Sequence, residues 1–335
     1  MANSSAARIL NQTEVEALPP PSLRARIITR LVRLAVKRWP RRDYRALVRR
    51  ARRLFGLPPW LSFAVSFGVN YERTTSADLC GEWIIPDAND FDDRVLLYLH
   101  GGGYVSCSPQ SHRPITAALA RLLHHRVFAL DYRLAPECPF PAAVDDAARA
   151  FLWLTDHGFK PQNIAIAGDS AGGGLTIATL LRLKRMQQPL PACAACLSPW
   201  LDLTGECNYG NAGSCAMFRP EDISAFAGIY LNGVSPRSPE ASPVFADLTG
   251  LPPLLMQASS TELLFDEAMC LHRNALHNGV DSSLRVYAGV PHVWQMFTFL
   301  MPEAGAALKE IAAFVAAKMS ALSGSKVTIQ PPVPR

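Results

Sequence analysis

The chain contains no apolar run of the roughly 18 residues that a membrane-spanning helix requires. Its first eight residues lack the apolar core and the cleavage site of a secretory signal. The eight cysteines follow no repeated spacing, which argues against a disulfide scaffold. From these absences we expect a cytoplasmic protein with reduced thiols.

Acidic residues are scarce before residue 60, where fourteen Arg and Lys residues stand against only three acids. This segment produces the net charge of +5, and the rest of the chain is net acidic. Aromatic residues are not interleaved with the basic ones as stacking platforms for bases. No nucleic-acid partner is therefore predicted.

An amphipathic basic helix is predicted after a polar, proline-ended tail that covers about residues 1–20. From Leu23 to Trp39 apolar residues recur at helical spacing, with arginine and lysine between them. We expect this helix to pack its apolar stripe on the domain beside it. A helix that lies on a membrane surface is the alternative.

Beyond residue 60, short apolar runs alternate with segments of helical length. The runs cover 94–99, 126–130, 163–167, 191–197, 254–258 and 284–287, and the helical segments cover 112–124, 142–157, 173–187 and 264–278. This order predicts an α/β fold in which a mostly parallel central sheet carries helices on both faces. The stretch from Pro199 to about Ser242 has no clear strand and is predicted to be an insertion.

The strongest motif is Gly168-Asp-Ser-Ala-Gly172, which follows strand 163–167 and opens the next helix. This context is typical of the nucleophile elbow of α/β-hydrolases, a turn so tight that the neighbours of the nucleophile must be small. The serine then projects from the sheet edge at a helix N-terminus, where the dipole favours developing negative charge. Ser170 is the predicted nucleophile.

A second motif, His100-Gly-Gly-Gly-Tyr104, comes directly after strand 94–99. Consecutive glycines leave backbone N–H groups available to hold an oxyanion. We expect the N–H groups of Gly102 and Gly103 to serve in this way, together with that of Ala171, the residue after the nucleophile.

An acid and a histidine then follow in the order that this fold requires. Glu262 is the first acid beyond strand 254–258, and His292 comes after strand 284–287. Asp266 lies four residues further on, about 6 Å along a helix, which is too far to make the same hydrogen bond. Asp266 and Glu267 are interpreted as acids of a helix's first turn.

These motifs resemble the hormone-sensitive-lipase family of bacterial-type carboxylesterases over about residues 60–320. Further matching stretches are Asp131-Tyr-Arg-Leu-Ala-Pro-Glu137, Phe140-Pro-Ala-Ala-Val-Asp-Asp146, Ser198-Pro-Trp200 and Leu251-Pro-Pro253. The resemblance implies an α/β-hydrolase fold with a helical cap over the active site. It implies cap helices in 1–55, a catalytic domain in 56–198 and 243–322, a cap insertion in 199–242 and a C-terminal tail in 323–335.

The chain departs from this family at two positions. The family usually has aspartate where this chain has Glu262, and glycine where it has Val293, directly after His292. Glutamate is an accepted triad acid. The predicted triad is therefore Ser170, Glu262 and His292.

Several other features receive structural interpretations. Cys193 and Cys196 have a zinc-like spacing but no second ligand pair, so they are expected to be core residues of a strand. The resemblance favours an ion network for Arg133 and Glu137 over a catalytic role. Family members often pair through the edge strand near 283–288, and a homodimer through this edge is predicted.

The predicted function is that of a serine carboxylesterase that hydrolyses short-to-medium acyl esters through an acyl-enzyme. A small-molecule ester is the expected partner, and the resemblance implies neither a metal nor an organic cofactor. Two alternatives are a lipase that works at a membrane surface and a small-molecule receptor that keeps the fold but has lost the triad.

Overall fold

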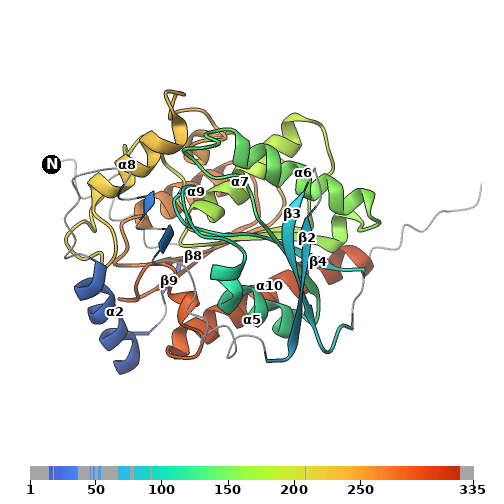
Figure 1. Ribbon diagram of the computed structural model, residues 1–335, viewed down its shortest axis with the longest axis horizontal. Helices are drawn as coiled ribbons and strands as arrows, with labels where there is room; N and C mark the ends of the chain where they lie inside the picture. Colours follow the sequence, from blue (N-terminus) through green and yellow to red (C-terminus); the bar gives the residue numbers. More distant parts are fainter. Residues whose placement is uncertain are drawn as a thin grey trace, which may run out of the picture.

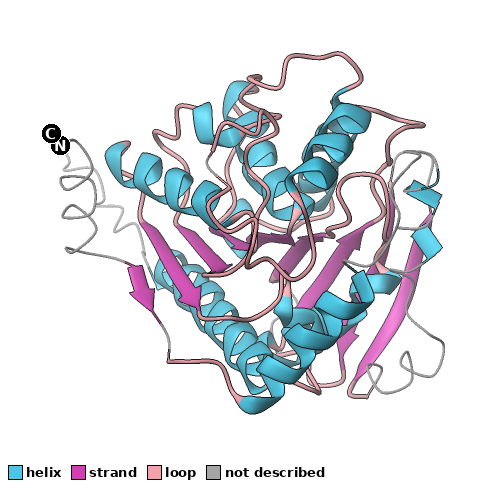
Figure 2. Cartoon of the chain, turned by 90° about the vertical axis from the view of Figure 1, so that its left-hand side faces the viewer, coloured by secondary structure: helices cyan, strands magenta, loops and turns pink. Residues whose placement is uncertain are grey.

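The computed structural model describes residues 15–17, 19–36, 46, 48–49, 52–53, 67–75, 79–90, 93–207 and 209–324. Most of the predicted N-terminal cap helices (1–55) and residues 325–335 of the predicted tail (323–335) lie outside these residues. The described chain forms one sheet with a layer of helices on each side (Figure 2). The predicted α/β architecture is thereby confirmed.

The sheet has the strand order β1-β9-β8-β7-β6-β4-β5-β3-β2. Neighbouring strands are parallel from β1 to β5, while β3 runs antiparallel to both β5 and β2. The strands span Val15–Ala17 (β1), Val69–Thr75 (β2), Cys80–Pro86 (β3), Val95–Leu99 (β4), Arg126–Leu130 (β5), Ile164–Asp169 (β6), Cys193–Leu197 (β7), Leu254–Ser259 (β8) and Ser282–Tyr287 (β9).

The helices divide between the two faces of the sheet (Figure 1). They span Leu23–Val36 (α2), Arg113–Leu123 (α5), Ala142–Asp156 (α6), Ala171–Arg185 (α7), Pro220–Leu231 (α8), Phe265–His277 (α9) and Pro302–Gly324 (α10). Helices α5 and α10 pack with alternate strand residues such as Leu96 and Tyr98, whereas α6, α7 and α9 pack with Val95, Leu97 and Leu99. This division follows from the alternation of side chains along a strand.

Several parts of the structure were not predicted as strands or helices from the sequence. The stretch from Pro199 to Ser242 contains helix α8 and, among its described residues, no strand. Strands β2 and β3 were not predicted, because they lie at the far end of the sheet and only Val69, Tyr71 and Thr74 of β2 are even partly buried. The long helix α10, which follows the last predicted strand, was not predicted either.

The N-terminal segment corrects two expectations. Residues 15–17 do not belong to a structureless tail, because they form β1 and pair in parallel with Leu284, Arg285 and Val286 of β9. Strand β9 is therefore not the edge of the sheet. The physical argument for a homodimer through 283–288 fails at these residues, because their outer backbone groups are already paired.

Helix α2 forms as predicted, but only part of its apolar surface packs on the domain: Ile28 is partly buried there, whereas Leu23, Ile27, Leu31 and Leu34 are exposed. It touches the body near the start of α10, where Ser22 N–H and Oγ donate to the Glu303 carboxylate at 2.6 and 3.2 Å. The only fully buried residue of the helix is Ala25. The small side chain of Ala25 allows α2 to approach the body closely, so the side of the helix with Ala25 is the one that packs. No helix among the described residues is long and apolar enough to cross a membrane.

Candidate active site

Ser170 lies in the one-residue turn between β6 and α7 and has φ +52°. Its N–H donates to Leu197 O at 2.8 Å, and its carbonyl accepts from the N–H of Trp200 at 2.9 Å. A Cβ at Gly172 would lie 2.0 Å from Leu99 O, so only glycine permits this close approach of α7 to β4. The turn therefore has the geometry of a nucleophile elbow.

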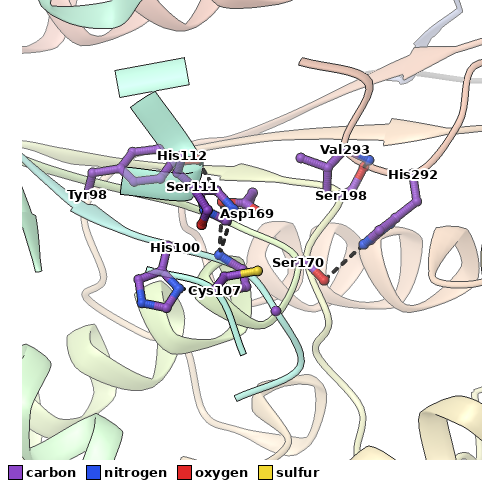
Figure 3. A network of polar contacts seen from close by, with 12 residues as sticks. Tyr98, His100, Cys107, Ser111, His112, Asp169, Ser170, Ser198, His292 and Val293 are labelled. Atoms are coloured by element: carbon purple, nitrogen blue, oxygen red, sulfur yellow. Dashed lines mark hydrogen bonds and ion pairs between the residues drawn. The ribbon is translucent and has the colours of Figure 1, made fainter. Parts of the chain in front are cut away.

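The side chains of Ser170, His292 and Glu262 form one hydrogen-bonded chain. The Oγ of Ser170 lies 2.9 Å from His292 Nε2, and His292 Nδ1 lies 2.6 Å from Glu262 Oε2. All three side chains are buried. The first of these contacts is drawn in Figure 3, where His292 points at Ser170. The structure thus brings together the three residues predicted as a triad.

The carboxylate of Glu262 is held by its own turn. Its second oxygen accepts the backbone N–H of Ser259 at 2.7 Å, so the longer glutamate side chain folds back on the end of β8. The two neighbouring acids face elsewhere. Asp266 lies 3.4 Å from the N–H of Gly210. Glu267 accepts the backbone N–H groups of Leu201 and Asp202 at 2.7 and 3.0 Å.

Glu267 is the most deeply buried of these acids. Burial raises the pKa of its carboxyl well above the usual range, and the backbone donors only partly oppose this effect. A carboxyl group committed to the backbone of the 201–202 segment is not available to His292. The sequence predicted that Glu267 is an ordinary acid of the first helical turn, and did not indicate that it is buried and binds the 201–202 backbone.

The loop that carries His292 is clamped on both sides. The Oγ of Ser259 donates to Val290 O at 2.6 Å, and the N–H of Val293 donates to the Oγ of Ser198 at 3.2 Å. Both serines are buried. Ser259 therefore contacts the acid through its N–H and the histidine loop through its hydroxyl, which holds the two in register.

The glycine loop, residues 100–103, follows β4 at the same edge of the sheet. Gly102 has φ +113°, and a Cβ there would lie 2.3 Å from Ser106 O, so this turn requires glycine. Among the described residues no acceptor contacts the N–H groups of Gly102, Gly103 or Ala171. These groups are left to bind something else.

A buried polar network lies behind the glycine loop. Asp169 Oδ1 accepts the hydroxyl of Tyr98 at 2.7 Å and the N–H of Gly101 at 3.1 Å, and its Oδ2 lies 3.2 Å from His112 Nε2. Figure 3 shows Ser170 between this network and His292. Burial alone raises the pKa of Asp169, but His112 and the hydrogen bonds outweigh it and lower the pKa.

His100 lies beside this network but does not carry charge. Burial, reinforced by the nearby His112, lowers the pKa of His100 to about 3. Its ring stacks on Tyr132 with centroids 4.2 Å apart, and its Nδ1 donates to Gly101 O at 2.8 Å. No sequence pattern had indicated a role for Asp169 or Tyr98. The one available signal was the position of Asp169 directly before the nucleophile in the motif.

Two aromatic side chains from the 199–242 segment reach the site. The ring of Phe218 meets the imidazole of His292 edge-on, with centroids 5.2 Å apart. The ring of Phe226, on α8, lies close to Gly103, since a Cβ there would be 3.2 Å from it. This segment therefore covers part of the site with apolar surface.

The remaining sequence interpretations concern residues away from Ser170. Arg133 pairs with Asp146 at 2.8 Å, and Glu137 pairs with Arg52 at 2.6 Å, so both belong to ion pairs. Cys193 and Cys196 are buried in β7, as expected of core residues. The described residues contain no cluster of three or more His, Cys, Asp or Glu side chains that could hold a metal ion.

A cavity of about 470 Å³ lies beside Cys107 and Tyr132. Its lining includes Cys107, Asp131 and the charged side chains Arg52, Arg133 and Glu137, but not Ser170. Burial raises the pKa of the Cys107 thiol to about 12, which keeps the thiol protonated. Cys107 thus lines this neighbouring cavity and supplies no nucleophile.

Known proteins resemble this chain in both sequence and fold. Residues 96–296 match a family model described as the alpha/beta hydrolase fold. An acetyl-hydrolase of Streptomyces hygroscopicus is 43% identical over 70% of this chain and 78% of its own. A crystal structure of an esterase from the bacterial hormone-sensitive lipase family superimposes with a TM-score of 0.82 at 39% identity, covering 90% of this chain and all of the other. Another similar structure, that of EstE5 soaked with p-nitrophenyl butyrate, has a TM-score of 0.82 at 34% identity and covers 89% of this chain and 99% of the other.

Proposed function

The chain belongs to the hormone-sensitive-lipase family of α/β-hydrolase-fold carboxylesterases, and we propose that Ser170, His292 and Glu262 carry out its ester hydrolysis. The observation that supports this assignment is the continuous chain of contacts from Ser170 Oγ to His292 Nε2 and from His292 Nδ1 to Glu262, at 2.9 and 2.6 Å. A nucleophile, a base and an orienting acid within hydrogen-bond reach are the parts that acyl transfer needs.

In the first half of the reaction Ser170 Oγ attacks the ester carbonyl carbon while His292 Nε2 takes the hydroxyl proton. The tetrahedral intermediate collapses, the bond to the alcohol oxygen breaks, and His292 gives its proton to that oxygen. The products are the free alcohol and an acyl-enzyme on Ser170. A water then repeats the sequence, with its proton passing through His292, and releases the carboxylic acid.

The negative charge that develops on the carbonyl oxygen needs donors already in place. We assign this role to the N–H groups of Gly102, Gly103 and Ala171, which meet no acceptor among the described residues. Ala171 is also the first residue of α7, where the helix dipole favours an anion. Glu262 keeps the imidazole in the tautomer that presents its unprotonated Nε2 to Ser170 and stabilises the imidazolium when it forms.

The proposed substrates are small esters with short-to-medium acyl chains. Phe218 and Phe226 place apolar rings at His292 and Gly103, which favours an apolar acyl group of limited length. The similar acetyl-hydrolase, and the similar structure soaked with p-nitrophenyl butyrate, support the same range.

A panel of p-nitrophenyl esters tests this proposal. We expect kcat/KM to be highest with acetate to hexanoate and to fall steeply from octanoate to palmitate. Replacement of Phe226 by alanine should move the optimum to longer chains. A preference for palmitate in the unaltered protein would contradict the proposed substrate class.

The alternative function is that of a receptor that keeps the fold but does not hydrolyse esters. Receptors of this kind lack a complete triad, whereas Ser170, Glu262 and His292 are here all present and in contact. Turnover of the panel esters distinguishes the two functions, because a receptor binds the ester without releasing p-nitrophenol beyond the background.

A further inference from the structure

Helix α2 carries a stripe of large apolar side chains that face solvent. The stripe consists of Leu23, Ile27, Leu31 and Leu34, which are 74, 51, 59 and 45% exposed. Their spacing of four, four and three residues places them on one side of the helix. Exposed large apolar groups gathered on one face, unlike single ones, mark interaction sites.

The attachment of α2 to the protein does not use this stripe. Ala25 is buried in a cluster with Trp294 and Met301, on the other side of the helix. Thr29 Oγ1 donates to Gly289 O at 3.2 Å from that same side. Figure 1 shows α2 at the periphery of the molecule, below the loops at the end of the sheet. The stripe is therefore a surface beyond what the fold itself requires.

The charge around the stripe has one sign. Four exposed arginines lie between the apolar residues, and the segment Leu23–Val36 contains no acid. On a helical projection Arg24 borders the stripe on one side, and Arg26, Arg30 and Arg33 border it on the other. Among the described residues, Arg26 and Arg33 donate to the backbone carbonyls of Pro21 and Ser214 and not to carboxylates. Their charge is thus not neutralised by these contacts.

We propose that the stripe of α2 is a docking surface for an anionic lipid membrane. A helix with one apolar face and arginines along both borders lies in the interfacial plane of a bilayer, with its apolar side chains among the acyl chains. The aliphatic stems of the arginines follow the apolar side chains, while the guanidinium groups reach the lipid phosphates.

A second copy of the chain is the less favourable occupant. A twofold pairing would place the same stripe of both copies face to face. The bordering arginines of the two helices would then approach each other with no acid on either helix to compensate. Like charges brought together in this way oppose association. An anionic surface instead attracts the same arginines.

Two further features place helix α2 next to the segments that carry catalytic residues. Thr29 contacts Gly289, three residues before His292, and Arg33 contacts Ser214 in the 199–242 segment. Phe299 and Leu300, 54 and 58% exposed, lie directly before Met301 of the cluster that holds Ala25. A membrane bound to the stripe would therefore lie one helix away from the loop that carries the base.

Vesicle sedimentation with the full chain tests the proposal. The probes are vesicles of phosphatidylcholine alone and of phosphatidylcholine mixed with phosphatidylglycerol. We expect the protein to pellet with the mixed vesicles only, and high salt to weaken the binding. The Ile27→Asp/Leu31→Asp variant should lose about tenfold or more of its vesicle affinity, because two large apolar side chains no longer enter the bilayer.

A matched control keeps the result specific to α2. Leu322→Asp alters another exposed apolar side chain, at the end of α10, and should pellet like the unaltered protein. Turnover of soluble p-nitrophenyl acetate should stay the same in all three proteins, and this separate readout tests the proposed hydrolysis independently of lipid binding.

Three outcomes overturn the proposal. The first is the absence of sedimentation with both kinds of vesicle, and the second is undiminished sedimentation of the Ile27→Asp/Leu31→Asp variant. The third is a dimer in lipid-free light scattering that this variant abolishes, since a second copy of the chain would then cover the stripe.

Discussion

The backbone N–H of Val293 donates to the Oγ of Ser198 at 3.2 Å, and this bond holds the residue directly after His292. Val293 has φ +50°, a left-handed conformation that crowds a β-branched side chain and that glycine adopts without cost. Ser198 is fully buried and is itself anchored to β8 through its N–H, which donates to Gln257 O at 2.7 Å. We infer that Ser198 compensates for a valine at a position where related proteins usually have glycine.

Ser198→Ala should therefore lower kcat by about tenfold with little change in KM, because the imidazole loses alignment rather than substrate contact. In a Val293→Gly background the same substitution should cost much less, since glycine holds the conformation unaided. The full double-mutant cycle, measured by ester turnover, gives the coupling between the two residues.

Additive effects in this cycle would show that Ser198 does not act through Val293. Thermal unfolding of each variant distinguishes lost alignment from lost stability. Ser214→Ala, which removes a hydroxyl of the 199–242 segment, serves as a control and should leave kcat unchanged.

The identity of the acid can be tested by comparing Glu262→Gln with Asp266→Asn. The first change keeps the size of the side chain but removes the charge that holds His292 in its productive tautomer, so kcat should fall by up to about 10⁴. The second should have a small effect, because Asp266 lies near Gly210 and not near His292. Steady-state kinetics with p-nitrophenyl butyrate measure both. A normal Glu262→Gln enzyme with an inactive Asp266→Asn enzyme would move the assignment to Asp266.

Asp169 should act as a positioning residue for the glycine loop. Its carboxylate accepts the N–H of Gly101 at 3.1 Å, two residues before the donor assigned to Gly103. Asp169→Ala should lower kcat by about tenfold or more while KM changes little, since the oxyanion exists only in the transition state.

A fold-only role for Asp169 predicts a different pattern. In that case activity would fall in proportion to the fraction of folded protein, and kcat per folded molecule would stay constant. His272→Asn is a suitable control, because it disturbs a buried hydrogen bond to Ser282 at 2.9 Å far from the glycine loop.

Acid should destabilise the protein in part through His100. The lowered pKa means that the unfolded chain binds a proton below pH 6.5, whereas the folded chain binds it only near pH 3. The stability that neutral His100 contributes is thus present above pH 6.5 and lost as the pH falls toward 3. In His100→Asn the free energy of unfolding should depend less steeply on pH between these limits, by up to about 1.4 kcal/mol per pH unit. Urea titrations at several pH values check this, and equal slopes would contradict it.

Local patterns were sufficient to predict the parts of the site that a short stretch of chain creates. Each of these parts comes directly after a buried strand in the sequence: the glycine loop, the elbow at Ser170, Glu262 and His292. Parallel strands bring their ends to one edge, so the order of elements alone predicts that these residues meet.

The remaining features depend on contacts between distant segments. The pairing of Asp169 with His112 joins residues 57 positions apart, and that of Ser198 with Val293 joins residues 95 positions apart. Periodicity predicted helix α2 but could not show which of its two apolar sides packs. The side with Ala25 and Ile28 packs on the body, where the small Ala25 allows a close approach, and the side with Leu23, Ile27, Leu31 and Leu34 stays exposed.

The central claim, that Ser170 is the nucleophile, is tested most directly by mass spectrometry after reaction with a p-nitrophenyl phosphonate ester. Phosphonylation forms a bond from phosphorus to the nucleophile oxygen and releases p-nitrophenol, but the adduct is not readily hydrolysed. We predict one adduct per chain, located on the peptide that contains Ser170, with loss of esterase activity in the same proportion. Ser170→Ala should acquire no adduct and should retain less than about 10⁻⁴ of the turnover. An adduct on another serine together with full inhibition, or substantial turnover by Ser170→Ala, would contradict the account.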